Sequence, residues 1–187
     1  MDLAACGSAA PAPGAPGAQP AGGPSGSKAG SAASSATNED AFGPLEVGAD
    51  YETYRRLTTE PFQSLDHGNR WVHVYVNETG AEAYLAAGDI PIGTIVVKTS
   101  VQNVDSKPSA IPGPIFVMEK RAQGYAPEHD DWWYAIHWAS PPPKEAARFG
   151  GPIYWRGRSP RVAYCWKCHD DYANSLGGLV PSSLLPR

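Results

Sequence analysis

A chain of 187 residues is long enough for one domain and a tail, and its net charge of -4 argues against nucleic acid as a partner. No stretch is both long enough and apolar enough to cross a bilayer. Aromatic residues are frequent, with 6 Trp, 9 Tyr and 4 Phe, which suits a core built around a flat apolar cofactor and equally any β-rich core.

The first 41 residues differ in composition from the remainder of the chain. Residues 7–37 are almost entirely Ala, Gly, Pro and Ser, which cannot bury enough apolar surface to offset the entropy lost on ordering. We therefore predict a disordered linker over residues 1–41. At its head, the stretch LAAC ending at Cys6 resembles a bacterial lipobox, whose cysteine carries lipid after cleavage, although chance in Ala-rich sequence is the alternative. The apolar stretch that normally precedes a lipobox is absent, which indicates a chain trimmed near the cleavage site.

A globular domain is predicted over residues 42–178, followed by a C-terminal tail over residues 179–187. Its opening residues, 50–57, combine helix-forming residues with apolar residues at helical spacing, and they predict a helix that Pro61 prevents from continuing.

Residues 71–76 are dominated by β-branched and aromatic residues and predict a strand, with Val72, Val74 and Val76 on one face. The other predicted elements are an Ala-rich helix over residues 81–87, ended by Gly88, and strands over residues 93–99, 115–120 and 131–138. Successive short strands imply an α+β fold that is mainly β, with an antiparallel sheet and a few flanking helices.

Near the C-terminus, Cys165, Cys168 and His169 form a CxxCH run, the attachment signature of a c-type haem. Two thiols at this spacing can form thioethers with the haem vinyl groups, and the adjacent histidine can ligate the iron. Two alternatives are half of a zinc site and a redox dithiol. Zinc needs two more soft ligands, whereas Cys6 is the one other cysteine, and a thioredoxin-type CxxC lies near the start of its fold.

The run therefore predicts one haem c, with its iron on His169, and leaves Cys6 for lipid. Covalent haem attachment in bacteria normally follows export, which favours the lipobox interpretation and a periplasmic, lipid-anchored protein. The membrane is then contacted only through the lipid on Cys6.

Several ordered motifs resemble the cytochrome P-460 family, small periplasmic c-type cytochromes of ammonia- and methane-oxidising bacteria. They lie at residues 67–77, 93–98, 117–121, 124–125, 131–134 and 165–169. The resemblance implies a curved antiparallel sheet with flanking helices around one haem, in a homodimer. It implies an open distal iron site, oxidation of hydroxylamine to nitrous oxide or to nitric oxide and nitrite, and a periplasmic electron acceptor such as another cytochrome.

The alternative function is non-enzymatic binding of nitric oxide, as in the related cytochromes c′ of β-sheet type. A plain electron carrier is a third, weaker reading, because a carrier normally has a second axial ligand such as Met, and the one internal Met is Met118 in a strand.

Lys98 is the residue that would separate the two branches. The resemblance implies that hydroxylamine oxidisers bond a lysine amine to a meso carbon of the porphyrin, a bond that the β-sheet cytochromes c′ lack. Lys98 ends an apolar strand on the same face as Val96, and a buried lysine is costly unless it is paired or modified. The alternative is that Lys98 lies at the strand end and snorkels into water. Lys120, in a charged strand end, is a weaker rival.

Asp131 is the candidate catalytic base. It lies in an acidic cluster just before an aromatic strand, and a carboxylate at the haem edge could accept protons from hydroxylamine. A solvated acidic turn is the alternative. Arg156, Arg158 and Arg161 are candidates to pair with haem propionates, with a surface role as the alternative.

Overall fold

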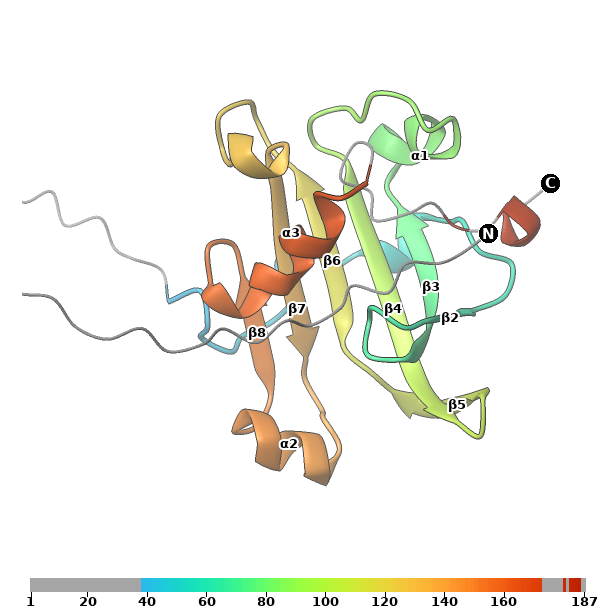
Figure 1. Ribbon diagram of the computed structural model, residues 1–187, viewed down its shortest axis with the longest axis vertical. Coiled ribbons are helices and arrows are strands. Elements are labelled where there is room, and N and C mark those ends of the chain that lie inside the picture. The colour runs from blue at the N-terminus through green and yellow to red at the C-terminus, as the bar shows by residue number, and fades with distance from the viewer. Residues whose placement is uncertain (1–37, 173–179, 181, 186–187) are drawn as a thin grey trace, which may run out of the picture. The chain divides into compact units, whose positions relative to one another are not determined.

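The computed structural model describes residues 38–172, 180 and 182–185. The predicted lipid-bearing Cys6 and the predicted linker up to residue 37 lie outside these described residues. In the described part of the chain, eight strands form one antiparallel sheet accompanied by three α-helices (Figure 1). The predicted fold class, mainly β with an antiparallel sheet and a few helices, is therefore confirmed.

The strands of the sheet are joined mostly by short connections. Their bounds are β1 Arg55–Arg56, β2 Phe62–Ser64, β3 Arg70–Val76, β4 Ile95–Val104, β5 Lys107–Pro112, β6 Ile115–Lys120, β7 Trp132–Trp138 and β8 Ile153–Arg156. The order across the sheet is β1-β3-β4-β6-β7-β8, while β2 also pairs with β3 and β5 also pairs with β4. Neighbours in sequence thus become neighbours in space, as is usual for an antiparallel sheet.

The three helices lie at different places on this sheet. They are α1 Glu78–Leu85, α2 Pro143–Phe149 and α3 Ala163–His169. α3 crosses the face of the sheet in front of β7, and α2 lies in the connection between β7 and β8, at one end of the sheet (Figure 1). Part of the predicted tail also contacts the domain, because the backbone N–H of Thr59 donates to the carbonyl of Leu184 at 2.9 Å.

The strand predicted over residues 71–76 is confirmed as β3, and its alternation is visible in burial. Val72, Val74 and Val76 are at most 1% exposed, while the residues between them are half-buried. The strand predicted over residues 115–120 coincides with β6. β3 has the period of two expected of a strand buried on one face, whereas β6 is an apolar run whose consecutive residues Val117 and Met118 are buried on opposite faces.

The helix predicted over residues 50–57 is wrong. Only Tyr51–Thr53 form a single 3-10 turn, and Arg55 and Arg56 then pair as a strand with Val76 and Tyr75 of β3. Helical spacing over so short a segment is a weak signal, because a helix this short gains little until it packs. Here the open edge of β3 offers backbone partners instead.

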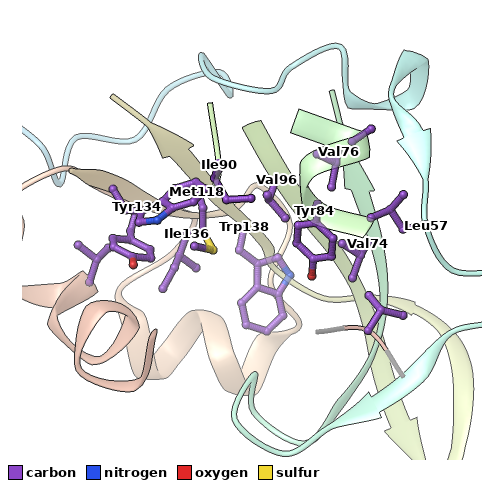
Figure 2. Packing of buried hydrophobic residues seen from close by; sticks show 14 of the residues in the cluster. Leu57, Val74, Val76, Tyr84, Ile90, Val96, Met118, Tyr134, Ile136 and Trp138 are labelled. Carbon is purple, nitrogen blue, oxygen red and sulfur yellow. The ribbon is translucent and has the colours of Figure 1, made fainter. Parts of the chain in front are cut away.

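The two faces of the sheet carry separate apolar clusters. One face packs Val74, Val96, Met118, Ile136 and Trp138 against the interior sides of α1 and α3, and Figure 2 shows part of this cluster. The cluster on the opposite face is smaller, and residues of the segment that precedes β1 pack against it. Its buried members are Val97, Val117, Trp133, Ala135 and Tyr154. The first of these faces contains the candidate site.

Candidate haem site

The CxxCH residues lie on α3, a helix of 7 residues. Cysteines three positions apart, and a histidine four positions after the first, project from the same side of a helix. His169 is 6% exposed, so this side of the helix faces the sheet. α3 is held in place at its end by Asp170, whose Oδ2 lies 2.8 Å from Nδ1 of His129, and the His129 ring stacks on Trp166 with centroids 4.8 Å apart.

A narrow pocket of about 40 Å³ lies between this side of α3 and the sheet. Its lining residues are Asp66, His67, Val96, Lys98, Phe116, Val117, Met118, Ala135, Tyr164, Cys165, Cys168 and His169. Four of the five predicted site residues therefore converge from two elements that are far apart in the chain, β4 and α3. The arrangement places a buried amine opposite two thiols and an imidazole.

Lys98 lies within β4 rather than at its end, since the strand continues to Val104. Its side chain is only 6% exposed, and its Nζ lies 3.5 Å from Nε2 of His67. Snorkelling into water is therefore the wrong expectation for this residue. Burial lowers the pKa of Lys98 to about 8, with the two thiols and Asp66 opposing the shift. About a tenth of the amine is then uncharged at pH 7, the form that can act as a nucleophile.

His67 is a pocket residue that sequence reasoning missed, because its ring was expected to serve only structural hydrogen bonds. Nδ1 does bond Ser64 Oγ, at 2.7 Å, and the ring packs edge-on against Phe116 with centroids 4.8 Å apart. Nε2 is then left facing Lys98 inside the pocket. Burial, together with Lys98 and His169, holds the pKa of His67 well below its ordinary value, so the imidazole is neutral. The His-Gly-Asn-Arg-Trp motif was the available signal.

A larger cavity of about 530 Å³ adjoins the narrow pocket. The two share Asp66, His67, Phe116 and Tyr164 as lining residues. The remaining walls of the large cavity are Gly68, Arg70, Pro114, Ile136, Trp138, Glu145, Arg148, Phe149, Ile153 and Trp155. Cofactor sites typically measure about 300–1,000 Å³ and have mostly apolar, aromatic walls with a few polar groups.

These features fit a c-type haem. The thiols and the imidazole are the donor set that such a haem uses, and the adjoining cavity has room for a flat macrocycle beside them. Burial raises the pKa of Cys165 to about 12. Within the described ranges, no group of three or more His, Cys, Asp or Glu residues could hold a metal ion, so the zinc alternative gains no support.

Asp131 is the predicted site residue that the structure does not bring to this pocket. Its Oδ1 accepts hydrogen bonds from the backbone N–H groups of Gly124 and Ala126, both at 3.0 Å. The carboxylate thereby closes the turn before β7, and Asp131 lines neither the narrow pocket nor the large cavity.

The rival lysine and the three candidate arginines also have other partners. Lys120 Nζ lies 2.8 Å from Oδ2 of Asp130. None of the three arginines lines the narrow pocket or the large cavity. Arg156 donates to the carbonyl of Ala41 at 3.0 Å, and Arg158 donates to the carbonyl of Tyr125 at 2.7 Å. Arg161 lies 3.5 Å from the carboxylate of Asp40. Their proposed pairing with propionates finds no geometric support.

Comparison with known proteins gives one family match. The sequence profile of the family described as Cytochrome P460 matches residues 48–175, which is well over half of the chain and includes all of the residues that line the two cavities. No curated protein matches the chain. Among the helices that the structure describes, none is long and apolar enough to span a membrane.

Proposed function

The chain belongs to the cytochrome P460 family, and on that premise we propose that it oxidises hydroxylamine at a single c-type haem, releasing nitrous oxide or nitric oxide and nitrite. The observation that carries the proposal is the position of Lys98. A buried amine with a lowered pKa lies in the same pocket as Cys165, Cys168 and His169. No pairing carboxylate neutralises this amine among the described residues, and covalent bonding to the cofactor would remove the cost of burying it.

Four residues of the pocket would hold the haem. Cys165 and Cys168 would bond the vinyl groups, His169 would ligate the iron, and Lys98 would be bonded through its amine to a meso carbon of the macrocycle. When bound, the haem supplies the iron site at which hydroxylamine loses electrons, and these pass to a periplasmic acceptor such as another cytochrome.

The protein itself contributes a positioned imidazole and apolar walls. His67 Nδ1 is held by Ser64 and its Nε2 faces the pocket, where its position suits it to accept a proton, while its lowered pKa makes it a weak base. Phe116 and Met118 line the same space with apolar side chains. The role of Asp131 as a base stays a prediction from the sequence. Its two hydrogen bonds from backbone N–H groups also give it a structural role.

On the same premise, the protein acts in the periplasm as a homodimer, with residues 42–178 as the haem domain and the lipid on Cys6 as its membrane anchor. Support comes from the CxxCH run, since haem is attached after export, and from the lipobox-like residues before Cys6.

The test is the absorption spectrum of the purified holoprotein, combined with its mass after denaturation. We expect a haem that stays attached and a broadened, red-shifted ferrous band, which Lys98→Leu converts to an ordinary c-type spectrum with loss of hydroxylamine oxidation. Lys107→Leu is the matched control, because Lys107 is exposed on β5 and should change neither property. An ordinary c-type spectrum in the unaltered protein, without turnover of hydroxylamine, would support nitric oxide binding instead.

A further inference from the structure

Two side chains in the wall of the large cavity have a buried hydrogen-bond donor without an acceptor. In the described part of the chain, three buried side-chain polar atoms lack a partner, and two of them, Arg70 Nη1 and Trp138 Nε1, belong to residues that line this cavity. Trp138 is 4% exposed and lies at the end of β7, within the apolar cluster of Figure 2. A buried donor without an acceptor typically costs about 1–3 kcal/mol, and more when the donor is charged. Two such donors in neighbouring side chains of one cavity wall point to an acceptor at this wall.

The two donors are held together as a unit. The guanidinium carbon of Arg70 lies 4.7 Å from the centroid of the Trp138 ring, within the range of a cation–π contact. Gly113 supports the Arg70 side chain from beside it, because a Cβ at this position would lie only 2.8 Å from Nη1. The site is therefore preorganised rather than a solvated surface arginine.

The formal charges that line the cavity balance, with Arg70 and Arg148 against Asp66 and Glu145. Glu145 opposes the burial-induced fall in the pKa of Arg70. No ion pair joins Arg70 to Glu145 within the residues that the structure describes. A planar guanidinium beside an indole N–H offers directed donors that match the two oxygens of a carboxylate.

The position of the pair indicates where that carboxylate comes from. In haem, the two propionates project from the edge of the macrocycle opposite the edge that carries the vinyl groups. Arg70 and Trp138 line the large cavity but not the narrow pocket that contains both thiols. A macrocycle attached through its vinyl edge to Cys165 and Cys168, and extending into the large cavity, would carry its propionates toward this pair.

We propose that Arg70 and Trp138 form a carboxylate-binding site that takes one haem propionate. The inference rests on haem binding in the proposed function, but not on the lysine bond or on hydroxylamine as substrate. It moves the propionate contact away from Arg156, Arg158 and Arg161, which have other acceptors.

The test uses the haem-loaded protein and follows the propionate itself. Arg70→Gln removes the charge, and Trp138→Phe removes the indole N–H and one of the two fused rings while keeping an aromatic ring under the guanidinium. The controls are Arg55→Gln, which alters an exposed arginine on β1, and Trp155→Phe, which alters a tryptophan of the same cavity that is not among the unpartnered donors. The readouts are the propionate bands in the resonance Raman spectrum and the haem midpoint potential measured from pH 5 to 9.

We expect Arg70→Gln to shift the propionate bands, to lower the midpoint potential, and to raise the proton affinity of the propionate about tenfold or more, since a cation within contact lowers a carboxyl pKa by about 1–3 units. Trp138→Phe should change the same readouts in the same direction by a smaller amount, and it carries the test if Arg70→Gln does not fold. If both variants behave like their controls, the propionate proposal is overturned while the proposed function stands.

Two further outcomes separate the possible sources of the carboxylate and the two levels of the proposal. Saturable binding of added formate to the holoprotein that Arg70→Gln abolishes, with propionate bands unchanged, would assign the site to a free carboxylate and overturn the propionate contact. Purified protein that carries no covalent haem would overturn the proposed function and this inference together.

Discussion

Replacing Lys98 with Met removes a buried amine from the wall of the haem site, and it should stabilise the haem-free protein. Lys98 is 6% exposed, and its pKa falls from 10.5 to about 8 because burial disfavours the ammonium ion. A difference of this size corresponds to about 3 kcal/mol of destabilisation at neutral pH, because one pKa unit is worth about 1.4 kcal/mol. Met has a comparable reach and buries a thioether without that cost.

The effect depends on pH with a definite sign. The pKa of Lys98 is lower in the folded than in the unfolded chain, so between about pH 8 and 10.5 the unfolded state binds the extra proton. The free energy of unfolding contributed by Lys98 therefore rises as pH increases through this range, and its cost is fully present below about pH 8. Lys98→Met lacks this dependence.

The assay is urea denaturation of the haem-free protein, followed by tryptophan fluorescence at pH 7 and pH 9.5. The free energy of unfolding of Lys98→Met should exceed that of the unaltered protein by up to about 3 kcal/mol at pH 7, and by about half of that at pH 9.5. Lys107→Met, on the exposed β5 strand, should match the unaltered protein at both values. Equal stability of Lys98→Met and the unaltered protein at pH 7, or a difference that grows with pH, would refute the buried-amine reasoning.

Two further predictions concern the packing that supports the site. Gly80→Ala should lower the free energy of unfolding by about 1–3 kcal/mol, because the added Cβ would overlap the fully buried side chain of Thr94. Gly43→Ala is the control in the same thermal unfolding experiment and should be neutral, because no atom lies within 4 Å of the added Cβ. Equal melting temperatures for the two variants would contradict the overlap. Thr58→Val should cost about 1–3 kcal/mol, because Thr58 Oγ1 lies 2.8 Å from Nδ1 of His73 and accepts from the backbone N–H of Val74 at 3.3 Å. An unchanged urea midpoint for Thr58→Val would show that these bonds contribute nothing to stability.

Elements with a clear apolar pattern were predictable from the sequence. β3 has the alternation that a strand buried on one face selects directly, and β6 has the short apolar run of a strand buried on both faces. The predicted helix over residues 81–87 forms, but as α1 it begins earlier, at Glu78, and ends at Leu85. The predicted strand over residues 93–99 begins at Ile95 and extends to Val104, because β5 continues to supply backbone partners beyond residue 99.

Segments whose conformation depends on a distant partner were not predictable. Arg55 and Arg56 become a strand only because β3 has an edge to pair with. β8 has only four residues, Ile153–Arg156, too few to show a period, and its pairing with β7 decides its conformation. For such short pieces the free energy comes from tertiary contacts, which local propensity does not contain.

The same division holds for the candidate site. The sequence by itself determined the haem signature, because the spacing of Cys165, Cys168 and His169 is a local property of one helical turn, and it placed Lys98 on the face of Val96 through strand alternation. Only the tertiary structure decided that Lys98 is buried beside those residues and that His67 faces it. The tertiary structure also placed Arg70 over Trp138 and left Arg70 Nη1 and Trp138 Nε1 without an acceptor. Contacts between residues far apart in the chain arise from how the strands pair and pack.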